Sequence, residues 1–307
     1  MDTDDYNGKN IHPKKIPMQR LTKLAILIFV FANITISAVK SEEADHSDFL
    51  RITREEGKKP PKTLDTAIVR YEGKVQVDLI AAIHVAEKRY YEDLNELFKN
   101  YDVVLYELVI PEGTEVSEEL FARRKDQKEE NLLSMVQVAL SDSLGLTHQL
   151  KVVDYTAKNF VHADLTAEEF LRRVAQRGDV AGVFSRAMMH SLSEQAQAQS
   201  GRVEGRLFAS LFTKNKTLTL KRIFADEMIN QMDTSMWILS GNEGSAIITD
   251  RNAIALKRLR EQIEAGKEKI AIFYGAAHLK EFAQSLQKEF QMKKTKTDWV
   301  VAWDLSK

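Results

Sequence analysis

The stretch VQVDLIAAIHVAEKRYYEDLNELFKNYDVVLYEL, residues 75–108, decides the fold because it has the pattern of a strand, a helix and a second strand. Val75 to Ile83 changes from alternating to continuously apolar, as a strand does when it enters a core covered on both faces. Glu87 to Asn100 carries apolar residues at helical spacing, and Val103 to Tyr106 is a short β-rich run. The stretch therefore predicts a β-α-β unit with parallel strands and a right-handed crossover.

A histidine and a carboxylate stand at the ends of these two predicted strands. His84 follows the first strand and Glu107 follows the second. Parallel strands bring their carboxyl ends to one edge of a sheet, the edge where α/β proteins bind ligands. We expect His84 and Glu107 to be neighbours there. A histidine at a strand end is more often a hydrogen-bonded structural residue, whereas an unpaired buried carboxylate is costly and is harder to explain structurally.

A second stretch, Lys269 to Leu305, repeats this layout near the C-terminus. A buried strand at Ile270–Tyr274 is followed by Gly275-Ala-Ala-His278, by a helix, and by a last strand at Trp299–Leu305. Asp304 falls near the position that Glu107 has in the first stretch. The repetition predicts an α/β (α+β) fold whose mixed central sheet comes from two pseudo-repeated β-α-β units.

The chain between the two stretches is predicted to be a large helical insert at about residues 112–248. Residues 112–148 have an amphipathic helical pattern, Lys151 to Tyr155 predicts a short strand, and Thr166 with Glu169 three places later predicts a capped helix start. The apolar residues from Val180 to about Ser240 recur at helical spacing. Ahead of the first stretch, Thr66–Tyr71 and the turn at Gly73 predict a hairpin.

The N-terminus has the pattern of a secretory signal over residues 1–38. Arg20 and Lys23 precede the apolar run Leu24–Ile36, and the small residues Ser37 and Ala38 follow it. The run is shorter than the roughly 20 apolar residues that span a bilayer, so cleavage is favoured over a permanent anchor. We expect an exported protein of the periplasm, the cell envelope or the medium, in contact with a membrane only if the segment stays uncleaved.

The remaining domain boundaries follow from composition. Residues 39–62 are charged and end in two prolines, which predicts a flexible tether, and residues 63–307 are predicted to form the folded domain. Met18 begins a more ordinary signal than Met1 does, so either methionine is a candidate start.

Charge and cysteine content exclude several functions. Lys and Arg total 44 and Asp and Glu total 45, so the chain as a whole has no positive field to hold nucleic acid. The chain has no cysteine, which excludes disulfides, thiolate metal sites and a cysteine nucleophile.

Two strand-end histidines and a carboxylate are the ligand types of a catalytic metal site. His84, Glu107 and His278 could hold a divalent ion such as manganese, cobalt or zinc, with Glu107 acting as a ligand or as a general base. Arg251, at the start of a helix that runs to Gly266, could bind a substrate carboxylate or an oxyanion, and Asn252 could donate an amide hydrogen bond. An exposed helix start is the simpler explanation of Arg251.

Three further polar residues are reserve candidates for the site. His162 and Asp164, in FVHAD, form the reserve pair, and Asp304 is the third. No Gly-x-Ser-x-Gly motif is present to support a serine nucleophile.

The order of these motifs resembles the TraB/PrgY/TIKI family, also called TraB/GumN-like, which is related to the ChaN-like and erythromycin esterase folds. Members carry two G-x-x-H motifs, a Glu between them and an Arg-Asn pair before the second motif. Here Ala81-Ala-Ile-His84, Glu107, Arg251-Asn252 and Gly275-Ala-Ala-His278 take these places. Ala81 departs from the family pattern by one methyl group.

The resemblance covers roughly residues 62–307 and implies two β-α-β units with a helical insert. In the TIKI branch it implies a metal-dependent protease, and in other branches capture of peptide signals or haem. We therefore expect an exported metal-dependent hydrolase, acting on a peptide or another small substrate. The alternative is a non-catalytic envelope protein that binds a peptide or haem in the same place.

Overall fold

The structure is a computed structural model that describes residues 47–54, 60–114, 116–117, 143–196, 206, 210 and 212–306. The predicted signal segment 1–38 lies outside these residues, as do residues 118–142 of the predicted insert. Among the described helices, none has both the length and the apolar character that crossing a membrane requires.

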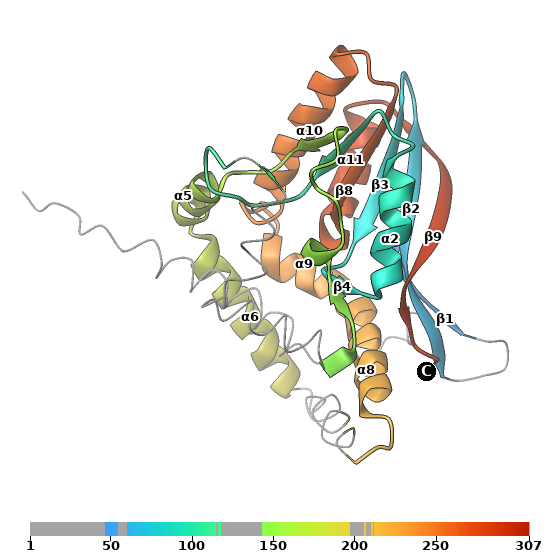
Figure 1. Cartoon of the computed structure of the whole chain (residues 1–307). Coiled ribbons are helices and arrows are strands. Elements are labelled where there is room, and N and C mark those ends of the chain that lie inside the picture. Colours follow the sequence, from blue (N-terminus) through green and yellow to red (C-terminus); the bar gives the residue numbers. More distant parts are fainter. Residues whose placement is uncertain are drawn as a thin grey trace, which may run out of the picture.

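A mixed seven-stranded sheet is the centre of the described part of the chain (Figure 1). Its strands are β1 (Leu50–Arg54), β2 (Pro61–Glu72), β3 (Gln76–Ala82), β5 (Val103–Tyr106), β7 (Phe160–His162), β8 (Lys269–Gly275) and β9 (Lys293–Asp304). The order across the sheet is β9-β2-β3-β8-β5-β7, and β1 shares one edge of β2 with β3. β2 is antiparallel to its neighbours, whereas β3, β8, β5 and β7 are parallel.

Helices and short elements connect these strands. The helices in the described residues are α2 (Lys88–Phe98), α5 (Ala167–Arg177), α6 (Asp179–Ala196), α8 (Lys216–Asn230), α9 (Met232–Ser240), α10 (Thr249–Glu264) and α11 (Leu279–Lys288). A small second sheet pairs β4 (Val85–Ala86) with β6 (Thr147–His148). Two 3-10 helices, η1 (Gln149–Lys151) and η2 (Ala276–His278), complete the set.

The first β-α-β segment forms as predicted, but its two strands are not adjacent. β3, α2 and β5 lie within the predicted ranges, and β3 and β5 are each parallel to β8. β8, which comes from the C-terminal stretch, lies between them and pairs with both. The sheet edge that carries the strand ends is therefore built from both halves of the chain.

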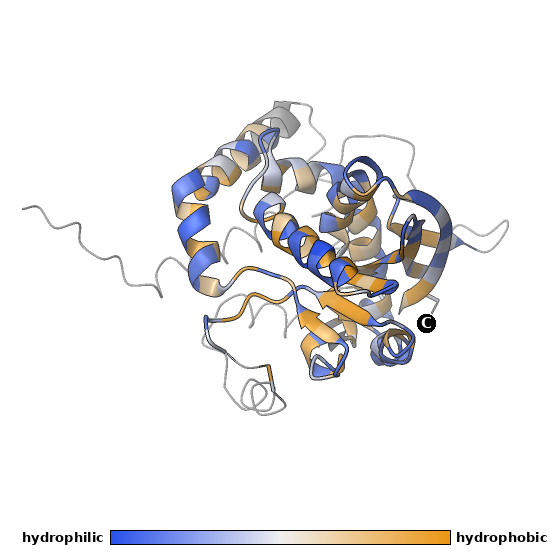
Figure 2. Ribbon diagram, turned by 90° about the horizontal axis from the view of Figure 1, so that it is seen from above, coloured by the Kyte–Doolittle hydropathy of each residue, from blue (hydrophilic) through white to orange (hydrophobic). Residues whose placement is uncertain are grey.

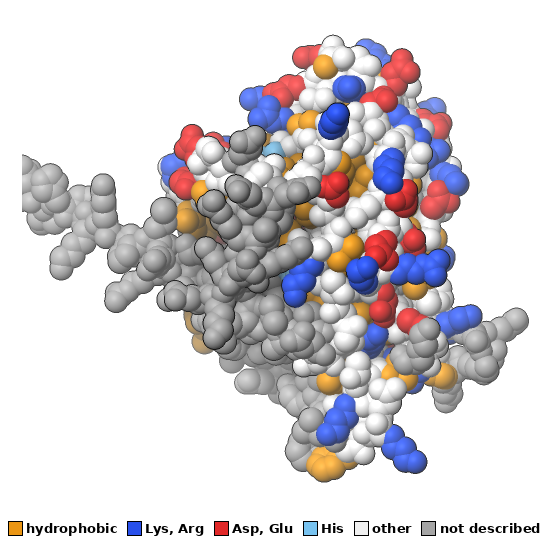
Figure 3. Space-filling model, in the orientation of Figure 1, with side chains coloured by type: hydrophobic (Ala, Val, Ile, Leu, Met, Phe, Trp, Pro, Cys, Tyr) orange, Lys and Arg blue, Asp and Glu red, His pale blue; other side chains and the backbone are white. Residues whose placement is uncertain are grey.

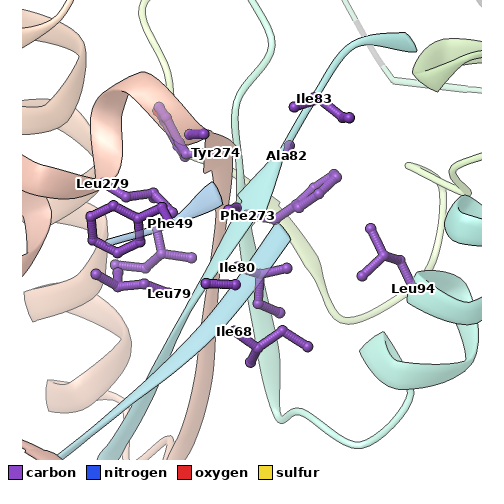
Figure 4. Packing of buried hydrophobic residues seen from close by; sticks show 14 of the residues in the cluster. Phe49, Ile68, Leu79, Ile80, Ala82, Ile83, Leu94, Phe273, Tyr274 and Leu279 are labelled. Atoms are coloured by element: carbon purple, nitrogen blue, oxygen red, sulfur yellow. The ribbon is translucent and has the colours of Figure 1, made fainter. Parts of the chain in front are cut away.

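The sheet is covered on both faces, and two neighbouring residues of β8 show it. Phe273 packs against Phe98 of α2, with ring centroids 4.9 Å apart, and Tyr274 packs against Phe282 of α11 at 5.1 Å. Because successive strand residues point to opposite faces, α2 and α11 lie on opposite sides. Figure 4 shows the same division, with Leu94 on the Phe273 side and Leu279 on the Tyr274 side. Apolar residues are concentrated along the strands between the helices (Figure 2).

The predicted strand Lys151–Tyr155 is wrong. η1 ends at Lys151 and turns follow it. The strand that joins the sheet is β7, which begins at Phe160, nine residues after Lys151. The amide of Asn95 on α2 explains the difference, since its Nδ2 donates to Val152 O at 2.8 Å and its Oδ1 accepts from Asp154 N at 3.1 Å. A side chain thus satisfies the backbone groups that a strand would have paired.

Two boundaries also differ from the prediction. The tether 39–62 is wrong for Leu50–Arg54 and for the start of β2, because β1 pairs with β2 within that range. The insert 112–248 is not purely helical, since β7 lies in it and extends the central sheet. The helix start at Thr166 is confirmed, with the Thr166 hydroxyl accepting from Glu169 N at 3.2 Å.

Candidate functional site

Three adjacent parallel strands place polar groups at one edge of the sheet. β8 ends at Gly275, Glu107 follows β5 directly, and Asp164 lies two residues after β7. β8, β5 and β7 are neighbours in this order. The carboxyl ends of parallel strands are where α/β sheets present their ligand-binding groups. The described residues therefore bring two carboxylates and a backbone N–H together at this edge.

Arg251 joins the two carboxylates from the first turn of α10. Its Nε and Nη2 donate to Asp164 Oδ1 and Oδ2 at 2.8 and 2.6 Å, and Nη2 also donates to Glu107 Oε1 at 2.7 Å. The residue is 8% exposed. The exposed helix start that sequence alone favours for Arg251 is therefore wrong. The two carboxylates accept hydrogen bonds from Nε and Nη2 of the planar guanidinium. Arg suits this arrangement better than Lys, which presents a single ammonium group.

Glu107 is held in its ionised form. Burial alone would raise the pKa of Glu107, but the charge of Arg251, with further help from His278, His84 and the Gly275 N–H, lowers that pKa to about 2. The Gly275 N–H donates to Glu107 Oε2 at 2.6 Å. A carboxylate with so low a pKa is a weak proton acceptor at neutral pH. Its contribution at this site is negative charge rather than basicity.

Gly275 leaves room for the close approach of this carboxylate. A Cβ at position 275 would lie 3.2 Å from Glu107 Oε2 and 3.8 Å from His278 Cδ2. The backbone at Gly275 has a φ of −51°, which other residues adopt, so the reason for glycine is space rather than backbone conformation. Glycine in Gly275-Ala-Ala-His278 thus lets the strand end contact Glu107.

His278 lies beside Glu107 at the junction of η2 and α11. Its Nε2 is 3.6 Å from Glu107 Oε1, and its Nδ1 is 2.6 Å from Asn252 Oδ1. The ring is buried, with 4% of the residue exposed. Burial lowers the pKa of His278 to about 4, although the charge of Glu107 acts in the opposite direction. His278 is therefore neutral at pH 7.

Asn252 connects His278 to α11. Asn252 Nδ2 donates to Glu281 Oε2 at 3.1 Å and to His278 O at 3.3 Å, and Asn252 is 1% exposed. Its amide is thus committed to protein groups rather than directed at a substrate. Glu281 has no counterpart among the sequence-predicted residues. Its position three places after His278 on a helix, and hence on the same face, is the signal that could have found it.

His84 lies one strand away from this cluster. It follows β3, which is separated from β5 by β8, and its side chain is exposed. Its ring is parallel to that of His148 at 6.5 Å, and its backbone carbonyl accepts from Gln149 N at 2.8 Å. The charge of His84 is near enough to lower the pKa of Glu107, although by less than the charges of Arg251 and His278 do. The interaction between His84 and Glu107 is thus an effect of charge on the pKa of Glu107, not a hydrogen bond.

The other reserve residues are placed differently from one another. Asp164 is part of the cluster, through Arg251. His162 lies in β7, and its Nε2 is 2.6 Å from Leu108 O. Asp304 ends β9, which is separated from β8 by β2 and β3, and it accepts from Ser306 N at 2.9 Å. Asp304 does not take a position equivalent to that of Glu107.

The side chains of His84, Glu107 and His278 are of the kinds that bind divalent metals, but they are not positioned around a common point. A neutral imidazole at His278 and an ionised carboxylate at Glu107 are both suitable ligands. However, Glu107 already binds Arg251 and Gly275 N–H, and among the described residues no group of three or more His, Asp or Glu side chains is arranged to hold an ion. Binding an ion at His84, Glu107 and His278 would require these side chains to move.

A separate pocket of about 230 Å³ lies between α6 and the loop after α9. Arg177, Asp179, Arg186 and Glu243 are among its lining residues, and no predicted site residue lines it. On the face drawn in Figure 3, basic and acidic side chains are interspersed over the described surface, in keeping with their near-equal totals.

Comparison with family models, with curated proteins and with solved structures found no match to this chain. The resemblance to the TraB/PrgY/TIKI family, drawn from the motifs, therefore stays a prediction.

Proposed function

We propose that this protein is a hydrolase whose reaction centre is the cluster of Glu107, Arg251 and His278. The observation that carries the proposal is the pair formed by the neutral His278 and the ionised Glu107, whose Nε2 and Oε1 atoms lie 3.6 Å apart in a buried setting. Perturbed titratable groups at the ligand-binding edge of a sheet are typical of catalytic sites.

In the proposed reaction, His278 is the general base and Glu107 stabilises the charge that forms. Burial keeps His278 neutral at pH 7, and its Nε2, 3.6 Å from Glu107 Oε1, is the atom that accepts the proton. A water O–H bond breaks, its proton passes to His278 Nε2, and the water oxygen bonds to the carbonyl carbon of the substrate while the π electrons of the carbonyl move onto its oxygen. The imidazolium faces Glu107 Oε1 and returns the proton to the leaving nitrogen or oxygen as the bond between that atom and the carbonyl carbon breaks and the carbonyl double bond re-forms.

Arg251 and Asp164 position Glu107 in this proposal. Arg251 makes three hydrogen bonds to carboxylate oxygens, so its role is to orient Glu107 and maintain its charge rather than to bind a substrate carboxylate. This departs from the substrate-binding role predicted for Arg251 from sequence. Asn252 likewise acts on His278 rather than on the substrate.

A divalent ion, membership of the TraB/PrgY/TIKI family and export remain parts of the proposal. His84, Glu107 and His278 are the residues that would hold the ion, which would supply Lewis acidity and a more acidic water in place of proton transfer to His278. The strand-helix-strand order of β3-α2-β5 and β8-α11-β9 supports an internal duplication, with His84 and His278 following the first strand of each unit. A peptide or ester is the substrate class that the proposed reaction fits.

Turnover of a peptide and ester panel by the purified full chain tests the proposal. We expect hydrolysis by wild type and a loss of at least about 100-fold in His278→Gln, since a general base contributes roughly 10²–10⁴-fold. His190→Gln, a change on α6 away from the cluster, is the control and should retain activity. Metal content of the same samples, with and without added manganese, cobalt or zinc, tests the ion. Tight retention of a peptide or haem without turnover would instead favour the binding-protein alternative.

A further inference from the structure

We propose that Glu281, acting through Asn252, holds His278 in the tautomer that carries its proton on Nδ1 and so directs the Nε2 lone pair toward Glu107. Glu281 is a positioning residue in this proposal, because its carboxylate bonds to Asn252 and Thr249 and acts on the imidazole through Asn252. The role of the tautomer in catalysis rests on the proposed hydrolase, whereas the tautomer itself does not.

The orientation of the Asn252 amide is fixed by two oxygen atoms. Asn252 Nδ2 lies 3.1 Å from Glu281 Oε2 and 3.3 Å from the backbone oxygen of His278. A backbone oxygen only accepts hydrogen bonds, so the reversed amide would set its own oxygen against these two oxygens. Asn252 is 1% exposed, so bulk water does not offset such a mismatch. The amide therefore presents Oδ1 to His278.

The Asn252 oxygen then determines the proton position on His278. Oδ1 of an amide has no proton to give, and it lies 2.6 Å from His278 Nδ1. Nδ1 must donate across this short contact. In a neutral imidazole the other nitrogen, Nε2, consequently carries the lone pair.

This tautomer places two hydrogen-bond acceptors opposite each other. Nε2 of His278 and Oε1 of Glu107 are 3.6 Å apart. A ligand with two donor hydrogens, such as water, satisfies both atoms and keeps its oxygen lone pairs free for attack on a carbonyl carbon. The opposite tautomer would place N–H at Nε2 and remove the base.

Glu281 makes the shorter of the two contacts that orient the amide. Without its carboxylate, Asn252 Nδ2 retains only the longer contact, 3.3 Å to His278 O. A reversed amide then sets its oxygen against one oxygen atom rather than two. Removing Glu281 should therefore release the amide and populate both tautomers of His278.

Long-range ¹H–¹⁵N spectra of the full chain with ¹⁵N-labelled histidine test the proposal at pH 7. The His278 signals are assigned by their loss in His278→Gln. We expect wild type to show a protonated Nδ1 and an unprotonated Nε2, and Glu281→Ala to lose this single pattern. Glu281→Gln should retain it, because its side-chain oxygen still accepts from Asn252. Lys280→Ala is the matched control, since Lys280 lies on the same turn of α11 as Glu281 and makes an exposed ion pair with Asp233 of α9.

Rescue separates positioning from a merely structural role. Hydrolysis should fall by about 10–100-fold in Glu281→Ala and recover in Glu281→Gln, the range found for residues that orient a metal-binding imidazole. A wild-type spectrum with Nε2–H, or an unchanged pattern in Glu281→Ala, would overturn the proposal. The expected spectra without any hydrolysis would overturn the proposed function and leave the tautomer assignment standing.

Discussion

Replacing Arg251 by Met is expected to destabilise the protein strongly. The methionine keeps an unbranched apolar stem but removes the guanidinium that makes three hydrogen bonds to Glu107 and Asp164. Removing one partner of a buried ion pair costs about 3–5 kcal/mol, because the other charge is left buried without compensation. For a domain of this size, about 2–4 °C of Tm corresponds to 1 kcal/mol, so a fall of about 6–20 °C is expected.

Urea unfolding followed by tryptophan fluorescence measures this loss at pH 7. Arg260→Met is the matched control, because Arg260 pairs with Glu289 at 2.5 Å on the surface, where the two side chains are 49% and 47% exposed. An exposed pair contributes less than about 1 kcal/mol. Equal losses in the two variants would refute the argument that Arg251 stabilises a buried pair of carboxylates.

The acid side of the same experiment tests the charge of Glu107. The folded pKa of Glu107 is about 2, below its ordinary value of 4.5, so its contribution to stability is complete above pH 4.5 and is lost as the pH falls toward 2. Without Arg251, burial raises that pKa. The stability gap between wild type and Arg251→Met should therefore narrow as the pH falls, beginning at the raised pKa of the variant and continuing below pH 4.5 as wild type loses stability. A constant gap would contradict the assignment.

Three further outcomes are expected. Burial lowers the pKa values of His278 and His148 from 6.5 to about 4, so their contribution to stability should be complete above pH 6.5 and fall as the pH drops toward 4, by up to roughly 3 kcal/mol for each residue. Urea unfolding should show a smaller fall in His148→Gln than in wild type. Equal falls in the two proteins would argue against a buried neutral His148. Gly275→Ala should cost about 1–3 kcal/mol, because its Cβ would lie 3.2 Å from Glu107 Oε2, and a thermal melt identical to wild type would show that the carboxylate yields freely. Phe273→Ala, in the core against Phe98, should cost about 3–5 kcal/mol in urea unfolding, and a loss below 1 kcal/mol would contradict the packing of α2 on β8.

The local spacing of apolar residues predicted most of the helices and strands near the site. The limits of β3, α2, β5 and β8 follow from runs of apolar residues, and the helix that presents Arg251 follows from its pattern up to Gly266. Because the carboxyl ends of parallel strands lie at the same edge of a sheet, Glu107 was expected near Gly275 and His278. These inferences need only short-range patterns and one rule of sheet geometry.

Long-range pairing explains what the sequence did not predict. Nothing within residues 75–108 indicates that β8 pairs between β3 and β5, and this insertion separates His84 from Glu107. The same holds for Asn95, whose side chain binds the backbone around Val152 and replaces the predicted strand. Glu281 was missed because its role depends on Asn252, which is on another helix.

Turnover of the peptide and ester panel by wild type and Glu107→Gln, measured side by side, tests the central claim most directly. Glutamine keeps the shape of Glu107 and loses the negative charge opposite His278. We predict hydrolysis by wild type and a loss of at least about 100-fold in the variant while it remains folded. Equal turnover by the two proteins, or no turnover of any substrate by wild type with or without added divalent metal, would contradict the claim that this cluster is a hydrolytic site.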